Sequence, residues 1–158
     1  FQPVNPSYTN GAKTAGYAGD YLSKAWQWAP AIYLAGLLLM NIISTPFGIS
    51  EMPDECPVDS YNCDYRIIVL DVSEEELDDA MREWAHDRSF TTTFSPGHIV
   101  DRSLVFQFPD DVHYSNECGT VDLFSKSRLG RSDMGVNSER IDDLVEFLMD
   151  YDFETTCQ

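Results

Sequence analysis

Hydrophobic residues form one long run in the first third of the chain and short periodic runs after it. Residues 25–50 carry no charged side chain, and Lys24 and Glu51 flank them. About 20 apolar residues in a helix cross the hydrocarbon core of a bilayer, and two tryptophans near the start stand where an aromatic belt is expected. The pattern predicts a transmembrane helix over residues 25–49. A buried core helix or hairpin of a soluble protein is the alternative.

Segments of different composition flank this helix. Residues 1–24 are rich in Pro, Gly, Asn, Ser and Tyr without a period, which predicts an irregular arm. Pro30 is expected in the first turn of the apolar helix, and Pro46 is expected to end it. Residues 50–64 are a polar linker with a Cys pair, and residues 65–158 are predicted to form an acidic α+β domain.

The first part of the acidic domain predicts a strand and then a helix. Residues 65–71 are β-branched and apolar, which is typical of a buried strand. Ser73 followed three residues later by Glu76 is a capping box. The residues after it place apolar side chains at i, i+3, i+4 and i+7 of an amphipathic helix: Leu77, Ala80, Met81 and Trp84.

The middle of the domain predicts antiparallel strands. Two segments alternate, with one face formed by Phe90, Thr92 and Phe94 in the first and by Leu104, Phe106 and Phe108 in the second. Pro109 is expected to stop the second segment. Two further strands are expected around a turn at residues 116–119.

A second amphipathic helix ends the domain. Asn137 is the expected N-cap, and the apolar face consists of Ile141, Leu144, Val145 and Leu148. The complete pattern predicts an α+β fold: an antiparallel sheet of four to five strands with two amphipathic helices on one face, preceded by one transmembrane helix.

Charge is distributed unevenly along the chain. Residues 51–158 hold 26 acidic and 8 basic side chains, whereas residues 1–24 hold two lysines and one aspartate. The positive-inside tendency therefore predicts the N-terminus on the cytoplasm-like side and the acidic domain across the membrane. Such a negative domain is not expected to bind nucleic acid or to lie flat on an anionic membrane surface.

The cysteines fit that placement. All four follow the predicted span, on the side where disulfides persist: Cys56, Cys63, Cys118 and Cys157. Four cysteines allow three pairings, and the sequence does not choose among them. The spacing between the first two is too long for a zinc hook, so a loop-closing disulfide or buried thiols are expected there, and no metal site is predicted.

One segment near the C-terminus carries a family resemblance. "SRLGRSDMGVNSERI", residues 127–141, resembles the signature of the family catalogued as domain of unknown function 1499; the matching positions are Ser127, Arg128, Gly130, Ser132, Asp133, Gly135, Asn137, Arg140 and Ile141. Residues 106–112 are similar to the family's Phe-x-Asp-Asp strand, and residues 56–63 to its Cys-Pro opening. The resemblance implies no activity. It implies an envelope or plastid protein, often tethered to a membrane.

The same segment supplies the candidate site. We expect Arg128, Arg131 and Arg140 to reach the carboxylates of Asp110 and Asp111 across the sheet. Asp133 and Asn137 are expected to satisfy free N–H groups around a turn that Gly130 and Gly135 permit. The cluster is thus predicted to be a structural latch, and an anion site at a helix N-terminus is the alternative.

No catalytic residue is predicted. Asp110, Asp111 and His113 have the residue types of an acid–base cluster, but Asp111 and His113 are expected to share a strand face only as neighbours. His86 and His98 have no partners at metal-binding spacing. A hydrolase is disfavoured, since no base and orienting group accompany a nucleophile.

The predicted function is that of a non-catalytic, single-pass accessory subunit of a large membrane complex. A photosystem in a plastid thylakoid, with the acidic domain in the lumen, is the expected host. The alternatives are a respiratory complex and a membrane-tethered module that binds an anion or a lipid headgroup. No intrinsic cofactor is expected; chlorophyll, carotenoid or lipid would meet the span through the complex. The expected partners are other membrane subunits and the bilayer. Asn41 and the small pair at residues 35–36 are expected to pack on a neighbouring helix.

Overall fold

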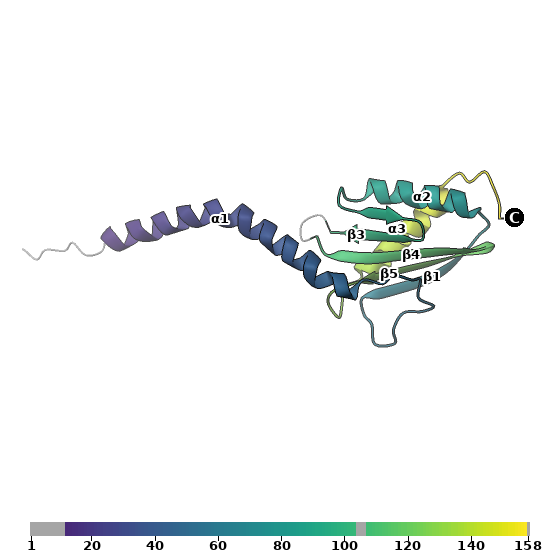
Figure 1. The fold of residues 1–158 in the computed structure, drawn as a ribbon, viewed down its shortest axis with the longest axis horizontal. Coiled ribbons are helices and arrows are strands. Elements are labelled where there is room, and N and C mark those ends of the chain that lie inside the picture. The colour runs from purple at the N-terminus through teal and green to yellow at the C-terminus, as the bar shows by residue number, and fades with distance from the viewer. Residues whose placement is uncertain (1–11, 104–106, 158) are drawn as a thin grey trace, which may run out of the picture. The chain divides into compact units, whose positions relative to one another are not determined.

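The computed structural model describes residues 12–103 and 107–157 and has the predicted α+β fold (Figure 1). Two compact units divide the chain, residues 1–39 and residues 40–158. The elements are α1 (Ala12–Ser44), η1 (Thr45–Phe47), β1 (Cys63–Leu70), α2 (Glu74–Asp87), β2 (Thr93–Ser95), β3 (His98–Arg102), β4 (Pro109–Glu117), β5 (Gly119–Ser127) and α3 (Val136–Asp150).

Helix α1 contains a stretch long and apolar enough to cross a membrane, Trp26–Phe47. Its mean hydropathy is 1.5 and only 6% of it is buried, so a buried core helix is disfavoured. The irregular arm expected over residues 1–24 is helical from Ala12 onward, and residues 1–11 lie outside the described part. Extending an existing helix adds one hydrogen bond for each residue fixed, so the weak helix formers of residues 12–24 can continue the apolar helix toward the N-terminus.

The prolines of α1 differ from expectation in one case. Pro30 lies inside the helix and not in its first turn, because the helix begins earlier than predicted. Pro46 follows the end of α1 at Ser44, as expected, and lies in the short η1 turn. The hydroxyl groups of Ser44 and Thr45 donate to the carbonyl oxygen of Asn41 at 3.1 and 2.8 Å, which satisfies a backbone group at the helix end.

The five strands form one antiparallel sheet in the order β1-β5-β4-β3-β2. Helices α2 and α3 pack on one face, and the core lies between them and the sheet (Figure 1). The core side chains come from the sheet (Ile68, Ile99, Val112, Tyr114, Val121 and Leu123), from α2 (Leu77, Ala80, Met81, Trp84 and Ala85) and from α3 (Ile141, Leu144 and Leu148). Burying one such large apolar side chain contributes about 1.5–3 kcal/mol to stability.

The strands before β4 are shorter than predicted. Strand β2 covers three residues; Phe94 packs against the core, but Phe90 is exposed in the preceding loop. Leu104 and Phe106 lie outside the described residues. Pro109 begins β4 and does not end a strand, because hydrogen bonds of Gln107 and Phe108 to Ser103 have already brought the chain back beside the end of β3.

The predicted capping box of α2 is half formed. Ser73 accepts a hydrogen bond from the backbone N–H of Glu76, as expected. The Glu76 carboxylate does not return to the cap. It accepts instead from the backbone N–H groups of Glu154 and Thr155, at 3.0 and 2.7 Å. The C-terminal tail is thus held on the first turn of α2.

Helix α3 begins differently from the prediction. Gly135, with φ of 89°, is the N-cap, and Asn137 lies inside the first turn. Asp133 performs the capping: its two carboxylate oxygens accept from the N–H groups of Gly135 at 3.0 Å and of Asn137 at 2.8 Å. An aspartate one turn earlier reaches these donors because positive φ values at Met134 and Gly135 reverse the chain between them.

Replacing Asp133 by Ala is therefore expected to lower the free energy of unfolding by about 1 kcal/mol, the usual value of a lost helix cap. Urea unfolding of the full chain in detergent, followed by near-ultraviolet circular dichroism, measures this change. Ser138→Ala, an exposed change in the same turn, is the control and is expected to stay within about 0.5 kcal/mol of the unmodified protein. An equal loss in both variants would contradict the assignment of the cap.

Two disulfides settle the pairing that the sequence left open. Cys56 is bonded to Cys63, which closes the linker loop before β1. Cys118, in the turn between β4 and β5, is bonded to Cys157 near the C-terminus. The second bond joins the tail to the end of the sheet at which Glu76 also holds it.

Candidate functional site

Strand β4 places charged side chains on both faces of the sheet. Successive residues of a strand point to opposite faces, so Asp110 points toward the helices and Asp111 toward the other face. All residues of β4 from Pro109 to Tyr114 are buried, which means that both faces are covered here. Asp110 and Asp111, which the sequence analysis assigned to one latch, therefore belong to two separate clusters.

The first cluster, the buried arginine cluster, lies between the sheet and α3. Arg140, only 4% exposed, donates to Asp101 at 2.9 Å and to Asp110 at 2.5 Å. Its third nitrogen donates to Ser125 and to Asn137, at 3.0 and 2.7 Å. A planar guanidinium can satisfy several acceptors in fixed directions, which suits a closed site of this kind.

A second arginine supports the same cluster. Arg88, which follows α2, donates to Asp101 at 3.2 Å and to Asp143 of α3 at 2.8 Å. Burial alone raises the pKa of Asp101, but the charges of Arg140 and Arg88 outweigh burial and hold that pKa below its ordinary value. The carboxylate is therefore charged and paired at neutral pH.

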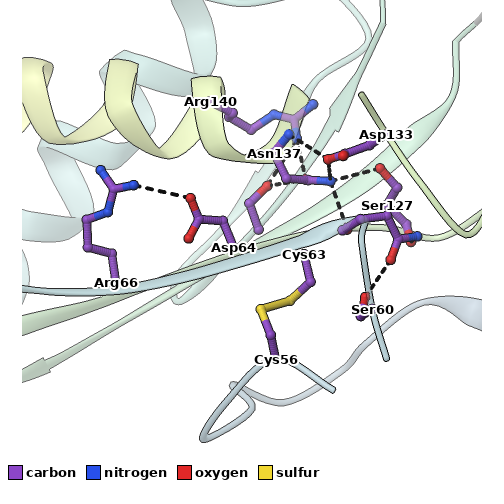
Figure 2. The surroundings of a disulfide bond; sticks show 11 residues. Cys56, Ser60, Cys63, Asp64, Arg66, Ser127, Asp133, Asn137 and Arg140 are labelled. Carbon is purple, nitrogen blue, oxygen red and sulfur yellow. Dashed lines mark hydrogen bonds and ion pairs between the residues drawn. A yellow bond between two sulfur atoms is a disulfide. The ribbon is translucent and has the colours of Figure 1, made fainter. Parts of the chain in front are cut away.

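Asn137 extends the cluster to the linker (Figure 2). Its amide nitrogen donates to the carbonyl oxygen of Asn62 at 2.9 Å and to the hydroxyl of Ser127 at 3.0 Å. Asn62 in turn donates to the carbonyl oxygens of Ser127 and Gly130, at 3.2 and 2.8 Å. The residue next to the Cys56–Cys63 disulfide is thus tied to the turn that precedes α3.

The second cluster lies on the opposite face and contains two histidines. His98 of β3 pairs directly with His113 of β4, and their rings stack with centroids 4.2 Å apart. Asp111, two residues before His113, accepts a hydrogen bond from His98 at 2.8 Å. Asp111 and His113 share a face, as predicted, and the pairing of β3 with β4 adds His98 to them.

These residues hold the chain that follows the candidate span. The N–H group of Ile49 donates to Asp111 at 3.0 Å, and the carbonyl oxygen of Ile49 accepts from His113 at 3.1 Å. Arg128 donates twice to the same aspartate, at 2.9 and 2.6 Å. Gly48 lies so close to Arg128 that a Cβ atom there would be 3.1 Å from Cζ. We call Asp111, His113 and Arg128, with the bound Gly48–Ile49 segment, the linker clamp.

The clamp also defines protonation states. Burial raises the pKa of Asp111, but hydrogen bonds from His98 and Arg128 outweigh it and bring the pKa to about 2. Burial and the neighbouring His98 lower the pKa of His113. A charged aspartate accepts from the Ile49 N–H group, and a neutral histidine with its proton on Nε2 donates to the Ile49 carbonyl oxygen.

His98, Asp111 and His113 have ligand atoms within 4.8 Å of one another, which is close enough for a metal ion. Their bonding does not favour one. Both oxygens of Asp111 already accept two hydrogen bonds each, and one donor is the cation of Arg128. The histidine rings lie parallel and do not converge on a point. This arrangement is suited to holding the linker.

The family model described as "Protein of unknown function (DUF1499)" matches residues 68–148, just over half of the chain. These residues include the end of β1, the other four strands, α2 and nearly all of α3. The chain belongs to the DUF1499 family. No curated protein and no solved structure matched it.

The DUF1499 match covers the residues of the two clusters but not the segment that the linker clamp binds. It includes the whole buried arginine cluster and the clamp residues Asp111, His113 and Arg128. Ile49 and the Cys56–Cys63 loop lie outside it. The DUF1499 domain of this chain therefore supplies the binding groups, and the preceding segment supplies the backbone that they hold.

The predicted latch residues do not all come together. Arg128 and Arg140 pair with aspartates on opposite faces, so their guanidinium groups are not directed at one common ligand. Arg131 is exposed, and it forms no ion pair within the part of the chain that the structure describes. Asp133 and Asn137 join the cluster on the helix side. Sequence reasoning missed Asp101, His98 and Ile49, although pairing β3 with β4 across the connection at residues 103–108 would have placed the first two.

Acidification is expected to weaken the domain in two stages. The pKa of His113 is lowered from 6.5, so its contribution to stability is lost as the pH falls below that value. The pKa of Asp111 is lowered from 3.8 to about 2, so its contribution is present above pH 3.8 and is lost on further acidification. The second loss corresponds to about 2 kcal/mol in the free energy of unfolding.

Unfolding free energies measured in detergent across this pH range test the expectation. In an Asp111→Asn variant, which has no carboxylate to protonate, the decrease below pH 3.8 should be about 2 kcal/mol smaller. An unchanged pH profile in that variant would show that Asp111 is not the group responsible.

Proposed function

We propose that the protein is a non-catalytic, single-pass accessory subunit of a large membrane complex. The observation that carries the proposal is the linker clamp. The candidate span ends at Phe47, and both backbone groups of Ile49 are already bonded to the sheet two residues later. A domain attached so directly is suited to a fixed position beside neighbouring subunits, whereas a tethered enzyme usually needs freedom to search.

The side chains of the two clusters support a structural role. Asp101, Asp110 and Asp111 are all paired with arginines, and His113 is bonded to the linker. In the span, a Cβ atom added at Gly36 would contact nothing within 4 Å. Small residues permit the close approach of helices in a membrane, so this position fits a neighbouring transmembrane helix.

A photosystem in the thylakoid membrane is the host that we propose, with the acidic domain in the lumen. The likeness of family members to plastid proteins favours this host, and the excess of lysine before the span favours that orientation. Chlorophyll, carotenoid and lipid would then meet the span at its contacts with other subunits. A respiratory complex is the alternative host.

Fractionation of native membranes tests the proposal. After mild detergent extraction, the chain should co-migrate with chlorophyll–protein particles, and its partners can be identified by mass spectrometry of the same fraction. Co-migration with respiratory subunits would replace the host but keep the role. Quantitative recovery as a free monomer would contradict the proposal.

A membrane-tethered module for an anion or a lipid headgroup is the second candidate from the sequence. It is less well supported because Arg128 and Arg140 are engaged on opposite faces of the sheet. Of the three arginines, Arg131 alone is exposed to solvent.

A further inference from the structure

The two ends of the sheet differ sharply in charge. At one end, which we call the distal edge, Leu70 pairs with Gly119, and the C-terminal tail is bonded to Ser73 and Asp71. The segments that meet there are residues 71–76, 115–120 and 150–157. They hold eight carboxylates and no lysine or arginine.

The opposite end, which we call the linker edge, collects basic side chains. Arg102 pairs with Pro109 and Ser127 with Asp110 at this end, and Arg102 donates to the carbonyl oxygen of Thr91 at 2.6 Å. The loops here, residues 88–92 and 126–135, carry four basic side chains and one acidic one. Four carboxylates of the linker, between residues 51 and 59, offset them, so the edge is close to neutral in a strongly acidic domain.

The linker edge also exposes large apolar side chains. Phe90 is 92% exposed, Met134 is 96% exposed, and Tyr61, which bridges to Ser132, is 78% exposed. Met134 has a φ of 56°, a left-handed conformation that is uncommon outside glycine and costs free energy. The chain reversal that caps α3 thus leaves a large apolar side chain fully exposed at this edge.

The position of this edge along the chain identifies the contact. The last residues of the candidate span, from Met40 to Phe47, belong to the same compact unit as the domain. Gly48 and Ile49, which follow at once, are held by Arg128 and Asp111 beside the linker edge. The linker edge is thus the part of the sheet at which the chain arrives from the candidate span, and the distal edge is at the other end of the strands.

We propose that the linker edge rests in the headgroup layer of the bilayer. Phe90, Met134 and Tyr61 lie among the headgroups and the first carbons of the acyl chains, and Arg131 lies at the level of the lipid phosphates. Aromatic and basic side chains are favoured at this depth. The distal edge, with its eight carboxylates, then points into the aqueous phase, which limits electrostatic repulsion from anionic lipids.

Photocrosslinking of the full chain in phosphatidylcholine vesicles tests this proposal. A benzophenone amino acid is introduced at Met134 and, in a second variant, at Phe90. The control carries it at Val69, which is 83% exposed but pairs with Thr120 next to the distal edge. Mass spectrometry then measures the yield of lipid adducts at each site. All three positions are exposed, so folding should be retained in each variant.

The expected result is that lipid adducts form at positions 134 and 90 and do not form at position 69. Equal yields at the three positions, or no lipid adduct at 134 and 90, would overturn the proposal. The same variants in native membranes give a second comparison. Lipid adducts at positions 134 and 90 would support the bilayer contact. Adducts to a protein subunit at these positions would show that a protein covers this edge and would overturn the proposal. Because vesicles contain no other subunit, failure there is distinct from failure of the accessory-subunit proposal.

Discussion

Replacing Arg140 by Met is expected to lower the free energy of unfolding by about 3–5 kcal/mol, the largest effect of any single change considered. The side chain is 4% exposed and is bonded to both Asp101 and Asp110. Methionine keeps the volume of the site but leaves two buried carboxylates without their shared cation. Urea unfolding of the full chain in detergent, at neutral pH, measures the change.

Arg131→Met is the matched control, since both arginines belong to the same signature segment. Arg131 is exposed and has no ion pair among the described residues, so its replacement should change stability by about 0.5 kcal/mol or less. If Arg140→Met lowered the free energy of unfolding as little as Arg131→Met, the buried arginine cluster would not stabilise the fold. A large effect of Arg131→Met alone would reverse the assignment of roles.

The second large effect is expected for Asp111→Asn, at about 3 kcal/mol. The substitution removes the negative charge that Arg128 contacts through two hydrogen bonds, next to a second cation, Arg102, whose pKa is lowered by burial and then by the charge of Arg128. The carboxylate that accepts from the Ile49 N–H group also becomes an amide, which has fewer acceptor sites. Unfolding of the domain should therefore become easier and the linker should detach first.

Asp142→Asn provides the comparison for this variant. Asp142 pairs with Arg66 on the surface, and its side chain is 66% exposed. Surface ion pairs contribute about 0–1 kcal/mol, so this variant should remain close to the unmodified protein. If Asp111→Asn were as mild as Asp142→Asn, the linker clamp would not contribute to stability.

The regular elements could be predicted from the sequence because periodicity reports directly on burial. The apolar face of α2 at Leu77, Met81 and Trp84 is fully buried, and so is that of α3 at Ile141, Leu144 and Leu148. The apolar run of residues 65–71 likewise indicated β1, and the turn at residues 116–119 indicated the β4–β5 hairpin. The predicted α+β class followed from the order of these elements.

The irregular parts could not be predicted as well, because tertiary contacts decide them. Asn137 has the residue type of an N-cap, but Gly135 occupies that position, and a backbone reversal at Met134 and Gly135 lets the Asp133 carboxylate accept from the first N–H groups of the helix. Pro109 has the residue type of a strand terminator. It begins β4 because Gln107 and Phe108, just before it, are already hydrogen-bonded to Ser103 at the end of β3.

The candidate site was predicted in its residue types but not in its arrangement. The sequence suggested that the three arginines reach Asp110 and Asp111 without assigning pairs, and the structure pairs Arg128 with Asp111 and Arg140 with Asp110. Alternation along β4 separates these pairs onto two faces, and it follows from the strand itself. The bonds to Ile49 had no signal in the sequence, because they are made by backbone atoms of a residue more than sixty positions away.

Hydrogen–deuterium exchange at the Ile49 amide, with the full chain embedded in a membrane, measures the linker clamp most directly. The amide should exchange much more slowly than that of Glu55 in the exposed part of the linker, and Asp111→Asn should remove this protection. Exchange of Ile49 as fast as that of Glu55 in the unmodified protein would contradict the direct attachment of the domain to the end of its span.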